Sequence, residues 1–313
     1  MTPALERAGL PVRVHRDLAR AISAAENGNA DLRRVAPGLA PSGTREGAAY
    51  VVGVTGPPGA GKSTLVDQLI ERFRSRGDTV AVIAVDPSSP FTGGAVLGDR
   101  VRMQRHAGDT GVFIRSMASR ESGGGLAPAT HQAIALAERA GFSVVIVETV
   151  GVGQVELEVV GVADVVALLT VPALGDGVQT IKAGLTEIAD LFVVNMADRP
   201  GANRTASDLR AMVRDSGRTI PVLQTIARDG NGIDEVMEAL NALRDSHVSN
   251  AVRSLRFDVL RSVRDAAARR ALAALGAPQA LEILARLEAR AATRAQAREQ
   301  LLPLVLDEVI RAD

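Results

Sequence analysis

The chain has 313 residues, 46% of them hydrophobic, so it can bury a large core and is long for one compact domain. A formal net charge of zero and 2% aromatic residues argue against a protein that binds nucleic acid broadly through charge and base stacking. The absence of cysteine, of a long uncharged apolar run and of an apolar signal core predicts a cytoplasmic protein without disulfides, thiolate chemistry or a membrane span.

Residues 1–46 are predicted to form a helical extension followed by a linker. The apolar residues between Val12 and Ile22 have helical spacing, and the helix should end near Asn27. The stretch 36–47 contains two prolines and three glycines, which is typical of a linker or a surface loop.

Residues 47–245 alternate strand-like apolar runs with helical runs. This alternation predicts an α/β fold with a mostly parallel sheet flanked by helices. Residues 246–313 are rich in alanine and arginine, and helical runs at 255–275, 278–292 and 295–310 predict a C-terminal helical extension. The expected strands of the sheet are 50–55, 80–85, 112–114, 144–147, 165–171, 191–194 and 220–225.

The segment 56–63, GPPGAGKS, matches the phosphate-binding pattern G-x-x-x-x-G-K-[ST]. It follows the first expected strand and precedes a helical run at 63–73, which is the order that the pattern requires. In such a loop, backbone N–H groups converge on the β-phosphate, the helix N-terminus adds partial positive charge, and the serine hydroxyl is offered to Mg²⁺. The chain is therefore predicted to bind a nucleotide through Gly56, Pro57, Pro58, Gly59, Ala60, Gly61, Lys62, Ser63 and Thr64.

Lysine is rare in this chain: of 36 lysine and arginine residues, only Lys62 and Lys182 are lysines. Arginine can replace lysine where only a solvated positive charge is needed, but not where a compact ammonium must fit between phosphate oxygens or against one carboxylate. Lys62 occupies the lysine position of the phosphate loop. For Lys182 two interpretations stay open: a catalytic cation near Asp176 on the phosphate side of the sheet, or a remnant on a helix surface.

Several acidic residues are expected at the carboxyl edge of the sheet, where ligands of parallel sheets collect. Glu148 ends the fourth expected strand, and a carboxylate in this place can hold Mg²⁺ directly or through water. In the run that follows it, Gly151 can direct its N–H group to a γ-phosphate, and Gln154 is a further catalytic candidate. Asp86 and Asp99 are candidates for the same metal, or else helix caps or loop acids.

The base of the nucleotide is expected to bind at Asn195-Met196-Ala197-Asp198, after the sixth expected strand. The Asp198 carboxylate can accept both guanine N1–H and N2–H₂, whereas adenine has no matching donors and would leave a buried carboxylate unpaired. Met196 stands where the usual GTPase motif has lysine, and its side chain can cover the purine without supplying charge. Residues that touch the guanine oxygen are expected at Thr225, Ile226 and Ala227, with Ile226 in place of the usual serine.

Together these stretches resemble the methylmalonyl-CoA mutase-associated GTPases, the MeaB/ArgK family of P-loop GTPases. The likeness extends from about residue 12 to about residue 243 and is weaker in the C-terminal helices. The strings that carry it are GPPGAGKSTL, AVDPSSPFTGGAVLGDRVRM, IRSMASR, ETVGVGQ and GDGVQTIKAGLTEIADLFVVNMAD.

The resemblance implies a P-loop NTPase fold that binds GTP or GDP with Mg²⁺ and hydrolyses GTP. It implies that Asp86, Asp99 and Glu148 serve the metal, and that residues near 173–182 form a mobile segment that responds to nucleotide and partner. The implied partner is an adenosylcobalamin-dependent methylmalonyl-CoA mutase, whose cofactor loading and protection are coupled to GTP binding and hydrolysis. A homodimer joined through C-terminal helices is implied as well.

Three other classes of function compete with this interpretation. A phosphotransferase would need a base to activate a hydroxyl, for which Asp176 or Asp99 could serve, but the sequence has no catalytic-loop signature. A nickel metallochaperone would need Cys or His ligands, yet the chain has no cysteine and four scattered histidines. A deviant-loop partitioning ATPase would carry an early lysine where Pro57 stands.

Overall fold

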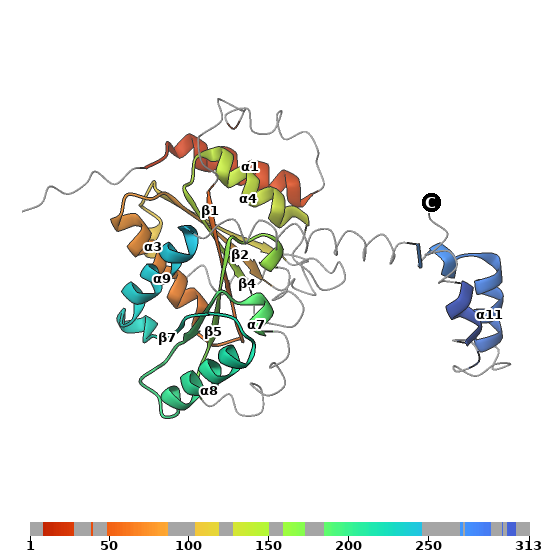
Figure 1. Cartoon of the computed structure of the whole chain (residues 1–313). Coiled ribbons are helices and arrows are strands. Elements are labelled where there is room, and N and C mark those ends of the chain that lie inside the picture. Colours follow the sequence, from red (N-terminus) through yellow and green to blue (C-terminus); the bar gives the residue numbers. More distant parts are fainter. Residues whose placement is uncertain are drawn as a thin grey trace, which may run out of the picture. The chain divides into compact units, whose positions relative to one another are not determined.

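The computed structural model describes residues 9–27, 39, 49–86, 104–118, 128–149, 159–172, 185–245, 270–271, 273–288, 296 and 299–304 (Figure 1). They belong to two compact units, Met1–Ser254 and Leu255–Asp313, and each unit is described by itself. The sequence-based domain bounds, after residues 46 and 245, stay a prediction.

The first unit contains a seven-stranded sheet with the order β3-β2-β4-β1-β5-β6-β7, and its neighbouring strands all pair in parallel (Figure 1). The predicted α/β fold with a parallel sheet flanked by helices is therefore confirmed. The chain leaves β1 toward one side of the sheet and returns to fill its other side after β4, and such a reversal is where ligands bind in open α/β sheets. The strands are β1 Tyr50–Thr55, β2 Val80–Asp86, β3 Val112–Ala118, β4 Val144–Thr149, β5 Val165–Thr170, β6 Leu191–Val194 and β7 Val222–Gln224.

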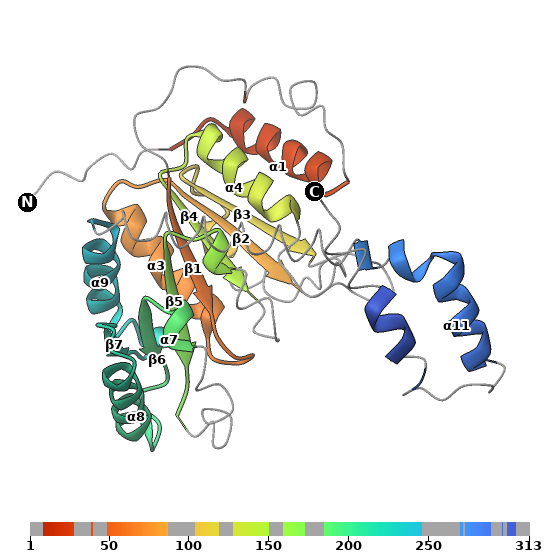
Figure 2. The ribbon, with the colours of Figure 1, turned by 45° about the vertical axis from the view of Figure 1, so that its right-hand side comes forward.

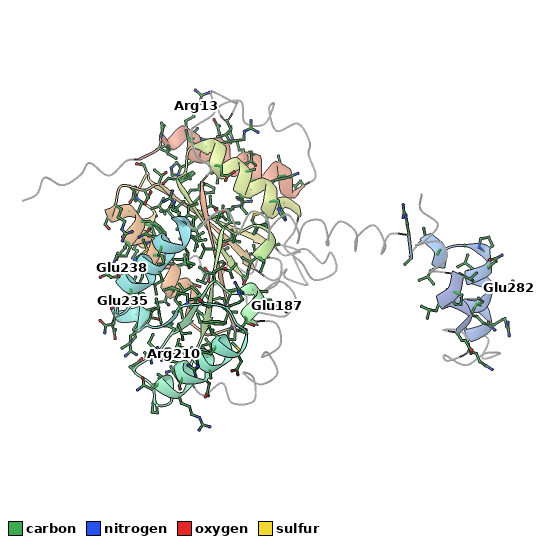
Figure 3. All side chains as sticks on the ribbon, viewed as in Figure 1. Arg13, Glu187, Arg210, Glu235, Glu238 and Glu282 are labelled. Atoms are coloured by element: carbon green, nitrogen blue, oxygen red, sulfur yellow. The ribbon has the colours of Figure 1, made fainter. Side chains whose placement is uncertain are left out.

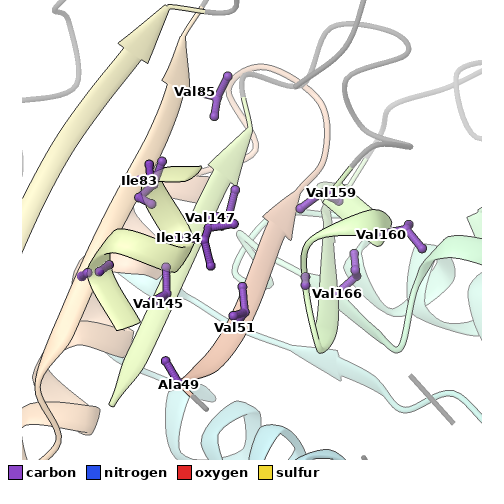
Figure 4. Packing of buried hydrophobic residues seen from close by; sticks show 14 of the residues in the cluster. Ala49, Val51, Ile83, Val85, Ile134, Val145, Val147, Val159, Val160 and Val166 are labelled. Atoms are coloured by element: carbon purple, nitrogen blue, oxygen red, sulfur yellow. The ribbon is translucent and has the colours of Figure 1, made fainter. Parts of the chain in front are cut away.

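The strands are apolar on both faces. Successive side chains point to opposite faces, so Val51 and Val147 belong to one core cluster, while Val52 and Ile146 belong to the other. Figure 4 shows the first cluster, in which Val51, Val145 and Val147 lie with Ile134 of the neighbouring helix α4 (Pro128–Ala140). Burial on both sides explains why these strands appear in the sequence as continuous hydrophobic runs.

Helices cover both faces of the sheet (Figure 2). The first cluster is closed by helices α1, α4 and α8, and the second by α3 and α9. The bounds of the helices in this unit are α1 Val12–Glu26, α3 Lys62–Ser75, α4 Pro128–Ala140, α7 Leu185–Ile188, α8 Ala202–Asp215 and α9 Ile233–Asp245.

The covering helices are amphipathic, as Figure 3 shows for α9. Glu235 and Glu238 lie on its exposed side. The residues that face the core are fully buried and recur at spacings of three and four, which is the spacing of one helix face. They are Ile233, Val236, Met237 and Leu240.

Among the strands whose bounds differ from the sequence-based prediction, β3 and β7 differ for identifiable reasons. The strand β3 was expected to end at residue 114 but continues to Ala118. Its Arg115 is accommodated because Nη2 donates to Ser23 Oγ at 3.0 Å and to Glu26 Oε2 at 2.6 Å, both on α1. The edge strand β7 is shorter than expected because Pro221, which has no N–H group to pair, directly precedes it.

The second unit contains the helix α11 Pro278–Glu288, which lies within the predicted helical run 278–292. Its Leu281 is 53% exposed, and Leu302 is 49% exposed. Within the described ranges of both units, the helices are too short or too polar to cross a lipid bilayer.

Candidate functional site

The phosphate-binding loop connects β1 to α3 at the carboxyl edge of the sheet. Gly56 and Gly61 have φ angles of +137° and +87°, which residues with a side chain rarely adopt. A Cβ atom on Gly56 would lie 2.2 Å from the carbonyl oxygen of Leu169, and one on Gly61 would lie 2.4 Å from Asn195 Nδ2. The two glycines are therefore required both by the backbone conformation and by the close approach of neighbouring segments.

Lys62 and Ser63 are the first residues of α3, and both are buried. The Nζ atom of Lys62 donates to the carbonyl oxygens of Gly56, at 2.8 Å, and Pro57, at 3.0 Å. The ammonium therefore lies against the first two residues of the loop. A planar guanidinium could not fit the same two acceptors in this space, which supports the interpretation of Lys62 as a retained lysine.

Ser63 is joined to Glu148, the last-but-one residue of β4. Its hydroxyl donates to Glu148 Oε1 at 2.7 Å, and the glutamate is 5% exposed. The strand register places Val54 of β1 opposite Glu148, so the sheet itself brings the carboxylate to the start of the loop. A second hydroxyl pair fixes these strand ends, because Thr149 Oγ1 donates to Thr55 Oγ1 at 2.9 Å.

The Ser63–Glu148 pair has the donor chemistry of a Mg²⁺ site, since Mg²⁺ takes oxygen ligands and commonly binds through one or two carboxylates together with substrate phosphates. Within the described residues no group of three or more His, Asp or Glu side chains could hold a metal ion by itself. Asp86 ends β2, next to β4 in the sheet, but its side chain lies outside the description. Ser63 and Glu148 could therefore hold the ion only in company with a phosphate or with ligands outside the described residues.

Asn195, directly after β6, connects the phosphate loop to the segment expected to bind the base. Its Nδ2 donates to Ala60 O at 2.8 Å. Its Oδ1 accepts from Thr225 Oγ1 at 3.1 Å and from the backbone N–H of Ala227 at 3.0 Å. Asn195 is 3% exposed, so these bonds are shielded from water and hold three separate segments together.

A hollow of about 180 Å³ lies beside this connection. Most residues of the predicted base site line it, whereas Thr225 is buried beneath and supports Asn195 instead. Met196 adopts φ +56°, a left-handed conformation that is uncommon for a side chain of this size. The lining residues are Gly61, Thr64, Asn195, Met196, Asp198, Arg199, Ile226, Ala227 and Arg228.

The sequence predicts that the carboxylate of Asp198 is buried, but the structure shows it partly exposed. Its side chain is 33% exposed, and its Oδ2 accepts from Arg228 Nη2 at 3.0 Å. The arginine follows Ala227 directly but was not among the predicted site residues, because no GTPase motif assigns it a contact to a residue 30 positions away. The pKa of Arg228 is raised by hydrogen bonding to Asp229 first and then by the charge of Asp198, so its charge is secure.

The described residues thus bring together the phosphate loop, Glu148 and the base segment at one edge of the sheet. Other predicted site residues lie outside the description, and their roles stay predictions: Asp99, Gly151, Gln154, Asp176 and Lys182.

Comparisons with known proteins show similarity to GTPases in sequence and in fold. The model of the family described as methylmalonyl Co-A mutase-associated GTPase MeaB matches residues 18–272. A Pyrococcus abyssi protein named as a GTPase is 52% identical over 237 residues, which cover 74% of this chain and 72% of the relative. The GTPase ArgK of Escherichia coli is 43% identical over 197 residues, 60% of each chain. A crystal structure of a LAO/AO transport system kinase matches with a TM-score of 0.59 and 25% identity, over 94% of this chain and 96% of that one.

Proposed function

Because the chain belongs to the family of methylmalonyl Co-A mutase-associated GTPases, we propose that it is a Mg²⁺-dependent GTPase switch that serves an adenosylcobalamin-dependent methylmalonyl-CoA mutase. GTP hydrolysis is the activity of the family. In the proposed role, GTP binding and hydrolysis are coupled to loading of the mutase with its cofactor and to protection of the mutase against inactivation. The family's description supports this partner.

The observation that carries the nucleotide chemistry is the hydrogen bonding of Asn195, which joins the phosphate loop to the base segment. In the proposed reaction, loop N–H groups and Lys62 hold the β- and γ-phosphates, while Asp198 reads the guanine edge. Ser63 and Glu148 would hold Mg²⁺, which offsets the negative charge of the phosphoryl group during transfer. Gly151, Gln154, Asp176 and Lys182 are proposed to act at the γ-phosphate.

The proposed assembly is a homodimer formed through the C-terminal helices. The family resemblance is what supports this arrangement, and the exposed side chains of Leu281 and Leu302 are candidates for the contact. Light scattering on the intact chain tests the proposal, and a monomer would contradict it. Removal of residues 246–313 should then give a monomer that still binds GDP.

The mutase role is tested by measuring GTP turnover with and without methylmalonyl-CoA mutase. We expect the mutase to stimulate turnover, and we expect Lys182→Ala to lose most of the stimulation while keeping its affinity for GDP. Cations supplied to the γ-phosphate are worth on the order of 10³–10⁵ in rate in other GTPases. Lys182→Arg, which keeps the charge but not the compact ammonium, serves as the matched variant. Full stimulation of Lys182→Ala would show that this lysine is a remnant.

A phosphotransferase is the second candidate, favoured by the match to a structure named as a transport system kinase. A kinase transfers the γ-phosphoryl group to its acceptor and releases little free phosphate, whereas a GTPase transfers that group to water and needs no other acceptor. Phosphate release from GTP by the purified protein alone therefore separates the two functions. Negligible release without any acceptor would favour the kinase.

A further inference from the structure

In the base hollow, Arg228 forms an ion pair with Asp198, whose carboxylate is expected to read guanine. Arg228 lies on the short 3-10 turn η5 Ala227–Asp229, and Asp198 lies 30 residues earlier, after β6. Arg228 Nη2 donates to Asp198 Oδ2 at 3.0 Å, and both residues line the hollow. The contact therefore lies inside the site and not beside it.

The chemistry of the two possible partners of Asp198 is similar. Guanine presents N1–H and N2–H₂ on one carbon, which is the donor arrangement of a guanidine. An arginine side chain presents the same kind of planar N–H fork to a carboxylate. Guanine bonds both carboxylate oxygens through its two N–H groups, and Arg228 Nη2 already bonds Oδ2 at the wall of the hollow, so the arginine and the base compete for that oxygen.

We propose that Arg228 is a specificity-determining residue, whose guanidinium bonds the Asp198 carboxylate and must leave it when guanine binds. This inference rests on the proposed role of Asp198 in reading guanine. Its consequence is specific to the base: a guanine nucleotide must displace Arg228, whereas an adenine nucleotide, which has no donors for Asp198, leaves the ion pair in place.

The surroundings of Arg228 suit a side chain that can move away. Its side chain is 69% exposed, and its Nε lies 3.3 Å from Asp229 Oδ2, a second carboxylate that can keep the guanidinium after it leaves Asp198. Hydrogen bonding to Asp229 and the charge of Asp198 raise the pKa of Arg228, which favours the charged form of the competitor. After displacement the guanidinium thus keeps its contact with Asp229 and its exposure to water.

The size of the effect follows from the strength of such pairs. Exposed ion pairs hold their partners together only modestly. The apparent affinity of a ligand equals its intrinsic affinity multiplied by the fraction of protein that is competent to bind it, here the fraction in which Arg228 does not bond Asp198. From these values we expect removal of the guanidinium to tighten GDP binding by about two- to sixfold.

The test compares binding of GDP and ADP by calorimetry in the full-length protein and in Arg228→Gln. We expect Arg228→Gln to bind GDP about two- to sixfold more tightly and ADP with unchanged affinity, so that guanine selectivity rises. Arg199→Gln removes a positive charge from the same hollow without touching the Asp198–Arg228 pair, and we expect it not to tighten GDP binding. Because Arg228 is mostly exposed, its replacement should leave the fold intact.

A double-mutant cycle with Asp198→Asn separates this inference from the proposed function. With the carboxylate gone, Arg228→Gln should no longer change GDP affinity. Unchanged or weaker GDP binding in Arg228→Gln, in a protein whose preference for GDP over ADP depends on Asp198, would overturn the inference alone. If Asp198→Asn keeps the full preference for GDP, the proposed reading of guanine by Asp198 is wrong, and the inference falls with it.

Discussion

The two halves of the nucleotide site are built differently. In the phosphate half, backbone groups define the site, and its residues match the expected pattern at every position from Gly56 to Ser63. In the base half, side chains define the site: Met196 and Ile226 depart from what a GTPase motif predicts, and Arg228 is a lining residue that the motif does not assign. Asn195 is the residue that joins the two.

The difference has a physical origin. Phosphate oxygens are recognised by converging N–H groups, and those require particular glycines at particular φ angles, so the pattern tolerates little change. A purine face needs only apolar cover, which lysine stems, methionine or isoleucine can all provide. The base half can therefore vary in sequence while keeping its shape, and its selectivity depends on single polar contacts such as that of Asp198.

The largest effect is expected in the phosphate half, from Lys62→Arg. The ammonium lies 2.8 and 3.0 Å from two loop carbonyls, and the larger guanidinium cannot take the same position. We expect the rate of GTP hydrolysis to fall by a factor of about 10²–10³, the loss seen when an enzyme loses one fixed hydrogen-bond donor to the charge that develops in its transition state. Single-turnover hydrolysis at saturating GTP measures this.

Lys62→Ala is the reference for that experiment, and circular dichroism confirms that each variant is folded. The two variants should be similarly slow, although one retains a positive charge. Activity of Lys62→Arg close to wild type would show that charge alone is needed here, and that the rarity of lysine in this chain has no bearing on the site.

The next effect is expected where the halves meet, from Asn195→Ala. This change removes the partners of Ala60 O, Thr225 Oγ1 and the Ala227 N–H inside the protein. Unpaired buried polar groups cost about 1–3 kcal/mol each, so we expect a loss of at least about 1–3 kcal/mol of unfolding free energy. We also expect weaker binding of both GDP and ADP, because the phosphate loop loses its attachment. Urea denaturation and calorimetry measure the two effects.

Asn203→Ala is the matched control for this change. Asn203 accepts one hydrogen bond, from Gln224 Nε2 at 3.1 Å, in an exposed position. Its loss should change stability by less than about 0.5 kcal/mol. Equal effects of the two substitutions would mean that Asn195 does not connect the halves in any energetically important way.

A smaller effect is expected in the base half, from Met196→Lys. This change restores the ammonium of the usual motif without altering the left-handed backbone at this position, since both residues are unbranched at Cβ. We expect GDP to bind a few times more tightly, the range of a single exposed charge contact. Met196→Leu, which supplies apolar cover only, should bind GDP as the wild type does. If Met196→Lys also binds GDP as the wild type does, methionine packing already suffices.

Much of the fold and of the phosphate half could be predicted because the determinants are local. The bounds of β1 and the loop after it follow from an apolar run and a glycine spacing within 14 residues of sequence, and the structure agrees with both. The extension of β3 could not be predicted in this way. It depends on the hydrogen bond from Arg115 to Glu26, which lies 89 residues away in the sequence. The spacing of residues gives no indication of such a pair.

The exposure of Asp198 and its pairing with Arg228 were missed for the same reason. A motif specifies which residue faces the base, but not which other side chain of the protein bonds that residue. Conversely, the burial of Asn195 and its three hydrogen bonds agree with its place in the motif, because its partners belong to the segments that the motif itself brings together.

The smallest effect is expected far from both halves, at Glu138 of α4. Burial raises the pKa of Glu138 above its ordinary value of 4.5, the charge of Asp164 raises it further, and a hydrogen bond from the Ala49 backbone partly opposes the shift. The fold therefore favours the protonated carboxyl. The resulting stability is fully present below the ordinary pKa and is lost as the pH rises through the raised value.

Glu138→Gln keeps the shape of the protonated side chain and removes its charge. We expect the variant to equal the wild type near pH 4 and to exceed it at pH 7 by less than about 1 kcal/mol, the range of a substitution outside the core. Urea denaturation at the two pH values measures the difference. GDP affinity should be unchanged in the variant, because Glu138 lies near Asp164 and Ala49, before the amino ends of β5 and β1, and the nucleotide binds beyond their carboxyl ends. A larger stability gain at pH 4 than at pH 7 would contradict the sign of the shift. A change in GDP affinity would show that the two ends of the sheet are coupled, and that the phosphate half is less self-contained than its sequence pattern indicates.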